Sequence, residues 1–503
     1  MAFALKGAWM RLPAAPLAAA VSILLALASA EGASASANQQ LLIEDEHHLL
    51  ERSHAEQLRA LDLIEELGAD KVRAVIWWRS MLADPRSEER PQGNAADSGS
   101  RLYEAERWER LDSLVRETRR RGIALMLTPA SASDLEGTRL QLPKWAQLAS
   151  GAPRVRQFTR FVKAVARRYS GGFVPPGTGR PLPPVLEWSL WNEPNAPSFL
   201  QPQWRLIDGR AIPWSPVIYR RLYSAAARAL RRNGHRQSRI YFGETTSTGV
   251  GISSPVGPMA PALFVRELTC LDRELEPYTG ADARRRECAG YRPLDTDGLA
   301  THFYSAGSAT APAFRVDPDA SLWTPGDPSR PGVLLTQLAL RGRLPRGLPV
   351  YNTEAGFQHH PLRRPLLTAA QQAHSLNVAE YLQWLNPSVA SFAQYLIYDD
   401  RSWFTGLRYI DGPPKPAYFA LRMPIVARYL GNGSIEVWGA AYGREQGRLT
   451  QILVNGLPLA VLNPGNRHGY FQTTVLGGPG ALVQSVDVLS GHRSRQAIVT
   501  PGF

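Results

Sequence analysis

The stretch LEWSLWNEPN, residues 186–195, decides the fold that we expect for this chain. Large apolar residues dominate the run at residues 185–191, which is typical of a β-strand buried on both faces. Pro194 has no N–H to donate to a neighbouring strand, so the strand is expected to end just before it. Glu193 therefore lies at the carboxyl end of a buried strand. In a (β/α)8 barrel that end is the catalytic face, so a second carboxylate is expected at the end of another strand.

Seven further strand-like stretches accompany this one, and sequence with helical periodicity separates each from the next. One helix is predicted after Ser53, which forms a capping-box pattern with Glu56, and another is expected to end at Gly122. Eight strands alternating with helices predict an α/β fold, a (β/α)8 TIM barrel, which we assign to residues 31–425. An open, doubly wound sheet is the alternative, but no G-x-G-x-x-G motif follows an early strand. The expected strands are residues 41–45, 72–78, 123–129, 185–195, 239–244, 299–305, 348–357 and 388–400.

From about Pro424 the pattern changes to short alternating stretches separated by Gly, Asn and Pro. This pattern predicts a small all-β sandwich domain at residues 426–503. The domain could be an accessory carbohydrate-binding module or a structural domain that covers the flank of the barrel. Trp438 and Tyr470 are its candidates for stacking on sugar, although core packing is the simpler interpretation for Trp438.

The charge of the chain is strongly positive but evenly distributed. Among its 503 residues, 44% are hydrophobic and 20% are charged, which is ordinary for a globular protein. The formal net charge is +13, and five of the 57 basic residues are Lys, which leaves 52 Arg. The arginines are not clustered in a stripe with interleaved aromatic residues. We therefore expect a solvated, Arg-rich surface and no binding to nucleic acid.

Residues 1–30 resemble a secretory signal peptide, with two basic residues, an apolar run at residues 17–28 and an Ala-Ser-Ala cleavage pattern. Cleavage after Ala35 or Ala37 is an alternative. The apolar run is shorter than the roughly 20 residues that span a bilayer, so no stable membrane insertion is expected after cleavage, although an uncleaved anchor stays open. In an exported protein, Cys270 and Cys288 are expected to form a disulfide. Free thiols are the alternative, and no nearby His pattern indicates zinc.

The second carboxylate that the fold requires is predicted to be Glu354, which ends the strand VYNTE and precedes Gly356, where the backbone can turn. It lies 161 residues after Glu193 (354 − 193), on the seventh strand, which faces the fourth across the mouth of a closed barrel. Two carboxyl groups flanking a glycosidic bond suit its cleavage. One protonates the leaving oxygen, while the other attacks the anomeric carbon or activates water. A separation of about 5–5.5 Å between them indicates the retaining route.

Three motifs resemble those of clan A glycoside hydrolases, closest to families 5 and 39. They are WNEPN on the fourth strand, T-E-x-G on the seventh and HFY at residues 302–304 on the sixth. The resemblance covers residues 40–425 and not the C-terminal domain. It implies that Glu193 is the acid/base, that Glu354 is the nucleophile, and that Asn192 binds the sugar 2-hydroxyl near the nucleophile.

The same resemblance implies that Arg73 keeps the nucleophile ionised and that His302 and Tyr304 line the site. Arg73 could instead form a plain salt bridge to Glu354, and His302 could be a hydrogen-bonded core histidine. Aromatic residues at or just past strand ends are candidates for stacking on sugar faces, and a strand amide is a candidate for hydrogen bonding. The further predicted substrate-binding residues are Trp78, Trp403 and Gln394, and Trp77 and Tyr398 are additional candidates for stacking.

Two other carboxylates lie on the expected strands. Glu187 is in the middle of the fourth strand, and Glu244 ends the fifth, which supplies no catalytic group in the families that the chain resembles. We therefore expect neither to be catalytic. The structural alternatives for the catalytic pair are a surface position for Glu193 and an ion pair for Glu354.

Together these features predict a secreted, retaining β-glycosidase or endo-β-glycanase that acts on a carbohydrate substrate by double displacement. No metal or organic cofactor is implied. A transglycosylase with the same residues, or a catalytically silent glycan-binding protein of the cell envelope, is the alternative. The sugar, the linkage, exo or endo action and the oligomeric state do not follow from the sequence.

Overall fold

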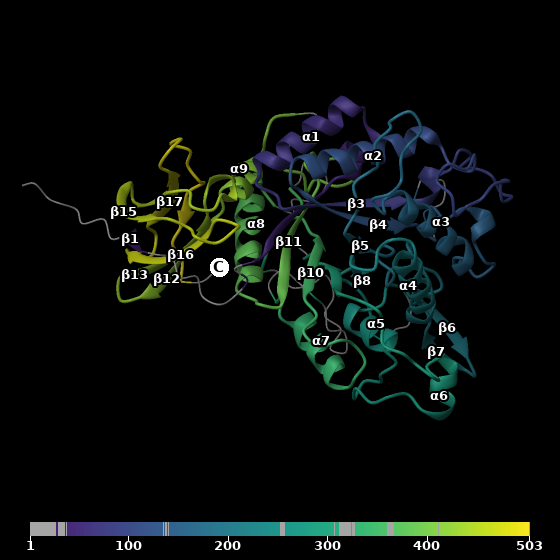
Figure 1. Cartoon of the computed structure of the whole chain (residues 1–503). Coiled ribbons are helices and arrows are strands. Elements are labelled where there is room, and N and C mark those ends of the chain that lie inside the picture. Colours follow the sequence, from purple (N-terminus) through teal and green to yellow (C-terminus); the bar gives the residue numbers. More distant parts are fainter. Residues whose placement is uncertain are drawn as a thin grey trace, which may run out of the picture.

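A computed structural model gives the arrangement of the chain. A large barrel domain is followed by a smaller, all-β C-terminal domain (Figure 1). The expected leader, residues 1–30, lies outside the described residues except for strand β1 (Leu27–Ala28), which pairs with the C-terminal domain. The structure describes residues 27–28, 36, 38–133, 135, 138, 140–251, 257–305, 307–310, 323, 327–359, 367–410 and 412–501.

The barrel is closed and its neighbouring strands are parallel, which confirms the predicted (β/α)8 fold and all eight expected strands. The last strand pairs with the first, so that Leu42 lies beside Ala393 and the sheet has no free edge. In chain order the strands are β2 (Gln40–Glu44), β3 (Lys71–Trp77), β4 (Ala124–Ala130), β5 (Glu187–Ser189), β8 (Arg239–Thr245), β9 (Gly298–His302), β10 (Val350–Glu354) and β11 (Val389–Tyr395).

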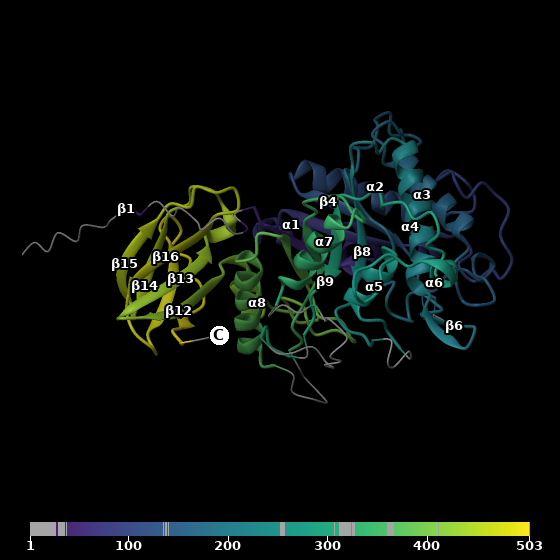
Figure 2. The same cartoon turned by 90° about the horizontal axis from the view of Figure 1, so that it is seen from below.

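Helices cover the outside of the barrel (Figure 2). The predicted capping box begins the first of them, because the Ser53 side chain accepts from the Glu56 N–H while the Glu56 carboxylate accepts from the Ser53 N–H. The second helix ends just before Gly122, whose φ of 72° lies in the left-handed region that favours glycine. The helices are α1 (His54–Glu66), α2 (Ala105–Arg120), α3 (Val155–Arg168), α4 (Ser215–Arg232), α5 (Pro261–Leu268), α6 (Gly280–Arg285), α7 (Arg330–Leu340), α8 (Ala369–Trp384) and α9 (Pro416–Arg422).

Short elements fill the loops at the carboxyl ends of the strands. A π-helical turn, η1 (His47–Glu51), follows β2, and a 3-10 turn, η2 (Trp78–Met81), follows β3. A hairpin that the sequence did not predict, β6 (Trp204–Ile207) and β7 (Arg210–Pro213), lies between β5 and α4. The two turns, η1 and η2, contribute walls to a cavity beside the barrel mouth.

A buried ion pair closes the amino-terminal end of the barrel interior. Lys71 Nζ lies 2.5 Å from Glu187 Oε2, and the Tyr241 hydroxyl donates to the same oxygen at 2.8 Å. Both charges are thus compensated away from water. Glu187 has a structural role there, and it does not reach the carboxyl ends of the strands.

The C-terminal domain is built from two sheets that share an apolar core, in agreement with the all-β prediction. Its first strand, β12, was not predicted from the sequence. The first sheet contains β12 (Ile425–Gly431), β13 (Ser434–Ala440) and β16 (Tyr470–Leu476). The second contains β1, β15 (Leu457–Leu462), β14 (Thr450–Val454), β17 (Leu482–Asp487) and β18 (Ala497–Ile498).

This domain packs against α8 of the barrel through buried aromatic and charged side chains. Arg444 binds both oxygens of Glu380, at 2.6 and 3.0 Å. Trp438 and Tyr470 are buried beside Trp384, with their own rings stacked 5.6 Å apart. Neither aromatic ring is therefore available to stack on a sugar, and both belong to the interface between the domains.

Cys270 and Cys288 form the predicted disulfide, in the segment that joins α5 to β9. Among the described residues, no helix is both long and apolar enough to cross a membrane.

Candidate active site

A cavity of about 490 Å³, here called the central cavity, opens at the carboxyl ends of the barrel strands. Five of the residues predicted from the sequence line it: Asn192, Glu193, Tyr304, Glu354 and Trp403. Two more, Arg73 and His302, lie fully buried beneath them. The structure thus brings together residues from five strands or the loops that follow them, as expected for the catalytic face of this fold.

The backbone after β5 turns sharply to present Glu193. Trp191 and Glu193 have φ angles of 74° and 39°, in the left-handed region that residues with a side chain seldom adopt. The Glu193 N–H donates to the Glu244 carbonyl at 2.8 Å, which holds this conformation. Asn195 is anchored in turn, because its side chain donates to the carbonyls of Thr246 and Met259. The WNEPN motif is therefore a fixed turn that directs one carboxylate into the cavity.

Glu354 ends β10 and is held by two donors. The Tyr304 hydroxyl donates to Glu354 Oε1 at 2.8 Å, and Arg73 Nη1 donates to Oε2 at 3.2 Å. Gly356 allows the chain to leave the strand, since a Cβ there would lie 2.7 Å from the Cβ of Thr405. These two hydrogen bonds fix the direction of the Glu354 carboxylate.

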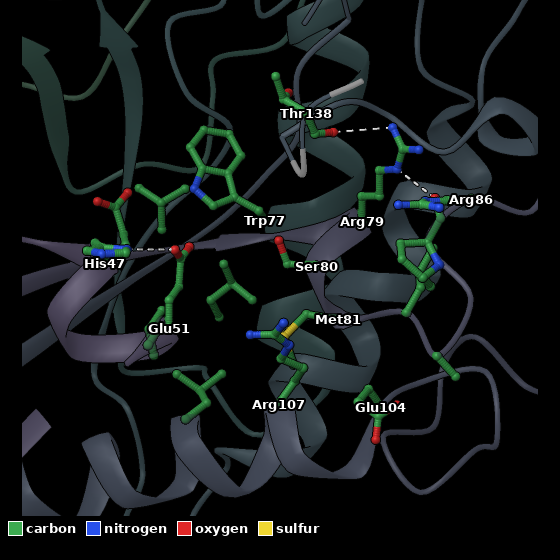
Figure 3. A pocket seen from close by; sticks show the side chains of 18 residues that line it. His47, Glu51, Trp77, Arg79, Ser80, Met81, Arg86, Glu104, Arg107 and Thr138 are labelled. Atoms are coloured by element: carbon green, nitrogen blue, oxygen red, sulfur yellow. Dashed lines mark hydrogen bonds and ion pairs between the residues drawn. The ribbon is translucent and has the colours of Figure 1, made fainter. Parts of the chain in front are cut away.

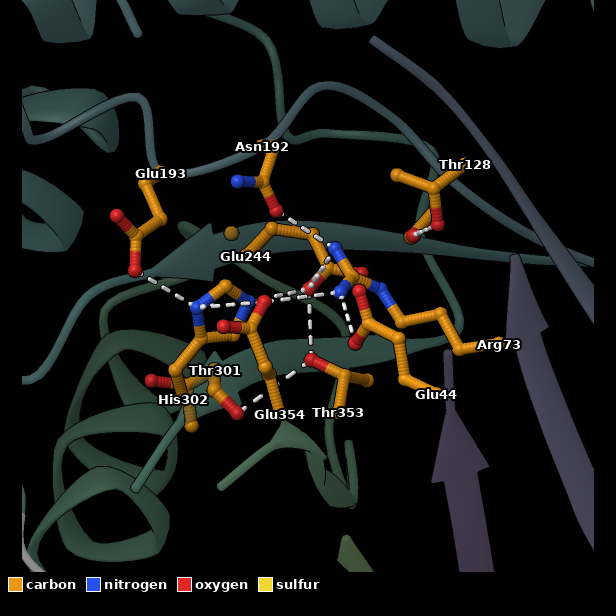
Figure 4. Close-up of polar contacts among 12 residues, drawn as sticks. Glu44, Arg73, Thr128, Asn192, Glu193, Glu244, Thr301, His302, Thr353 and Glu354 are labelled. Atoms are coloured by element: carbon orange, nitrogen blue, oxygen red, sulfur yellow. Dashed lines mark hydrogen bonds and ion pairs between the residues drawn. The ribbon is translucent and has the colours of Figure 1, made fainter. Parts of the chain in front are cut away.

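The two carboxylates face each other across His302 (Figure 4). One oxygen of Glu193, one oxygen of Glu354 and a ring nitrogen of His302 all lie within 4.8 Å of one another. This spacing fits a retaining carboxylate pair, for which about 5–5.5 Å is usual. The same three atoms could also ligate a metal ion, but His302 Nδ1 is already hydrogen-bonded to Glu193 Oε1 at 2.9 Å.

Arg73 connects the carboxylates beneath the cavity. Its guanidinium lies 2.5 Å from Glu44 and 3.2 Å from both Glu244 and Glu354. Burial opposes its charge, yet the carboxylates of Glu244 and Glu44 raise the pKa of Arg73 above its usual range. Arg73 Nη2 also donates to Asn192 Oδ1 at 2.7 Å, which leaves the Asn192 amide nitrogen as the group that can meet a sugar hydroxyl.

The largest difference from the sequence prediction is the part played by Glu244. This residue is fully buried, has a φ of 49°, and accepts from His302 Nε2 at 3.0 Å and from Thr353 Oγ1 at 2.6 Å. Burial would raise its pKa, but Arg73 and His302 lower the pKa of Glu244 to about 2. Glu244 does not line the central cavity, which agrees with the expectation that it is not catalytic. It positions the residues that do.

His302 is flanked by carboxylates on both ring nitrogens. Burial would lower its pKa, but Glu354, Glu193 and Glu244 raise the pKa of His302 to about 10. The contact with Glu244 fixes one proton on Nε2, so that Nδ1 shares the next proton with Glu193. His302 is therefore more than a satisfied core histidine, because it connects Glu193 to the buried charges.

Two further carboxylates of the site, Glu44 and Glu46, were not singled out in the sequence. Glu44 ends β2 beside Arg73, and burial raises its pKa well above the ordinary value. Glu46 begins the turn into η1 and lines the cavity wall, and burial raises its pKa to about 7. The signal in the sequence is the acidic run IEDE at the end of the first strand, which mirrors the position of Glu354 on its own strand.

The structure places two predicted substrate-binding residues away from the cavity. Trp78 is fully buried in the core, where its ring stacks on Phe161 at 5.6 Å. Gln394 is also buried, and its amide donates to backbone carbonyls of the loop after β11, at Leu396 and Thr405. These two assignments are corrected. Trp77, the other tryptophan expected at this strand end, does line the cavity, because β3 ends at Trp77 and the chain then turns.

No family model and no curated protein matches the chain. Solved structures with a similar course of the chain include an endo-β-1,4-mannanase from Thermotoga petrophila, with a TM-score of 0.42, 11% identity, and coverage of 92% of this chain and 98% of that one. A family 1 β-glucosidase from Thermotoga maritima has a TM-score of 0.44 and 15% identity over 70% of this chain and 81% of that one.

An FMN-binding β-glucuronidase from Facaelibacterium prausnitzii L2-6 has a TM-score of 0.41 and 11% identity, and it matches 92% of this chain. The chain covers only 56% of that protein. Structural similarity with TM-scores and sequence identities this low assigns no activity to the chain. Independently of them, the closed parallel barrel and the glutamates at the ends of its fourth and seventh strands agree with the resemblance to clan A glycoside hydrolases.

Proposed function

We propose that the protein is a secreted, retaining glycoside hydrolase that cleaves β-glycosidic bonds of a poly- or oligosaccharide. The observation that carries the proposal is the pair of carboxylates, Glu193 and Glu354, with oxygens within 4.8 Å of each other in one cavity. A protein that only binds glycans has no need of two apposed carboxylates. The disulfide between Cys270 and Cys288 favours an oxidising, extracellular location.

The different surroundings of the two carboxylates define their roles. Arg73 and Tyr304 donate to Glu354, so it suits the nucleophile that attacks the anomeric carbon. Glu193 contacts His302, with which it shares a proton, so it suits the group that protonates the departing oxygen. Bond cleavage then leaves a glycosyl ester on Glu354 and a free aglycone.

The second half of the reaction reverses these roles. Glu193, now without its proton, accepts a proton from water as the water attacks the anomeric carbon. The bond to Glu354 breaks, and the carboxylate returns to its hydrogen bonds with Arg73 and Tyr304. Asn192 can donate to the sugar 2-hydroxyl through its free amide nitrogen in both steps.

Turnover of 4-nitrophenyl β-glycosides by the purified protein tests this function. We expect release of nitrophenol from at least one of the β-glucoside, β-mannoside, β-xyloside and β-glucuronide. Glu354→Gln should lower kcat by more than about 10³-fold, because the attacking group is lost. The control is Glu109→Gln on the exposed face of α2, which should leave turnover unchanged. A wild-type protein that binds glycan but turns over no glycoside would reject the proposal.

A further inference from the structure

A second cavity of about 570 Å³ lies beside the central cavity, and we call it the arginine cavity (Figure 3). It is formed by η1, η2, the loop at residues 82–104 and the start of α2. Glu46 and Trp77 line both cavities, so the two spaces share one wall. The two cavities are therefore adjacent, which is the arrangement that linked units of one chain-like ligand need in order to occupy both.

Three arginines line this second space, and within the described residues none of them forms an ion pair with a carboxylate. Arg79 donates only to neutral acceptors: the carbonyls of Pro85 and Thr138 and the side-chain oxygen of Gln141. Arg86 and Arg107 have no ion pair with a carboxylate in the part of the chain that the structure describes. Arginine side chains that line a cavity without a carboxylate partner suit a ligand that carries carboxylate or sulfate oxygens.

The carboxylates of the cavity do not cancel this charge. Glu51 is engaged by His47 at 3.1 Å, and burial raises the pKa of Glu46 to about 7, so it is partly protonated at neutral pH. Glu104 is exposed at the rim, just before α2. The arginine cavity therefore has an excess of positive charge, in a protein whose net charge of +13 already attracts polyanions.

We propose that the arginine cavity binds an anionic sugar unit of the same glycan chain whose glycosidic bond is cleaved in the central cavity. The proposal rests on the proposed function and narrows its substrate class to acidic poly- or oligosaccharides. The volume is in the range of cavities that hold small ligands, about 300–1,000 Å³. Trp77, whose ring is stacked with Phe199 at 6.1 Å, supplies an apolar wall between adjacent sugar units.

The double variant Arg86→Gln/Arg107→Gln tests the proposal, because Arg79 also holds its loop and is best left in place. The matched control is Arg228→Gln/Arg232→Gln on α4, which removes the same charge outside both cavities. Both variants are placed on a Glu354→Gln background so that no chain is cleaved. Binding is measured by affinity electrophoresis against polyglucuronate, alginate, hyaluronan and dextran sulfate, with mixed-linkage β-glucan, mannan and xylan as neutral probes.

We expect at least one anionic glycan to bind more tightly than every neutral probe, and the cavity variant to weaken that binding by about tenfold or more. The control variant should stay within about twofold. Binding of dextran sulfate alone would identify sulfate, and binding of a uronate polymer would identify carboxylate, as the group recognised. Equal weakening by both variants, or no preference for any anionic glycan, would overturn the proposal.

The binding experiment also distinguishes failure of the proposed binding site from failure of the proposed hydrolase activity. A wild-type protein that turns over no glycoside, yet binds an anionic glycan through Arg86 and Arg107, would reject hydrolysis and keep the binding site. Thermal unfolding of each variant provides the folding check, and a cavity variant that unfolds early is replaced by the single variant Arg107→Gln.

Discussion

Replacing Glu244 by glutamine removes a fully buried carboxylate that contacts both Arg73 and His302, while keeping the size of the side chain. Glutamine can still accept from His302 Nε2, so the geometry of the ring should be kept. The charge that stabilises a protonated His302 is lost. We therefore expect the change to act on the proton that His302 shares with Glu193, and so on the alkaline limit of activity.

The size of the effect follows from the surroundings of His302. Its pKa rises from the ordinary 6.5 to about 10 through three carboxylates, which also overcome the opposing effect of burial. Removing one neighbouring opposite charge shifts a pKa by about one unit or more, at about 1.4 kcal/mol per unit. Glu244→Gln should thus lower the pKa of His302, and the alkaline limb of kcat/KM, by about one pH unit or more.

Two measurements test this expectation. Imidazole nitrogen shifts of ¹⁵N-histidine-labelled protein give the pKa of His302 without any substrate, and the pH profile of kcat/KM on an aryl glycoside gives the alkaline limb. Glu109→Gln, which removes an exposed carboxylate from α2, should leave both values unchanged. An unchanged alkaline limb in a folded Glu244→Gln protein would refute the role of Glu244 in holding this proton.

Three further changes are predicted. Tyr304→Phe removes a hydrogen bond to the Glu354 carboxylate and should lower kcat about tenfold without unfolding the protein, as kinetics and circular dichroism can check; an unchanged kcat would contradict it. Burial raises the pKa of Glu46 from 4.5 to about 7, so the free energy of unfolding should fall as the pH rises through this window. Glu46→Gln should therefore be more stable than wild type by about 3 kcal/mol at pH 8 but not at pH 4. Equal urea midpoints of the two proteins at pH 8 would disprove this. Arg444→Met leaves Glu380 buried without its partner and should cost about 3–5 kcal/mol of unfolding free energy, which a second change, Glu380→Leu, should largely restore.

Much of the fold follows from local sequence, because the barrel strands are short apolar runs bounded by polar turns. The hairpin β6–β7 was missed because most of its side chains are partly or fully exposed and mixed in polarity, so it lacks the apolar signal of the barrel strands. The meeting of Glu193 and Glu354 in one cavity could be predicted because each lies at or just after the carboxyl end of a barrel strand, and the order of the strands places the two opposite each other.

The rest of the site depends on which strands become neighbours. Glu44 and Glu244 acquire their roles only when Arg73 from β3 comes between them, and local sequence does not give that distance. The wrong assignment of Trp78 has a different cause. Successive residues of a strand point to opposite faces, so an error of one residue in the end of β3 moves the expected ring from the cavity to the core.

The most direct test of the account compares azide rescue of two alanine variants on the same activated aryl β-glycoside. Azide should restore turnover of Glu354→Ala by attacking the anomeric carbon in place of the carboxylate, giving a glycosyl azide of inverted configuration. In Glu193→Ala, azide should instead attack the ester on Glu354 and give the retained anomer. Proton NMR of the products distinguishes the two outcomes. The same anomer from both variants, or recovery of Glu354→Ala without an inverted glycosyl azide, would contradict the assignment of Glu354 as nucleophile and Glu193 as acid/base.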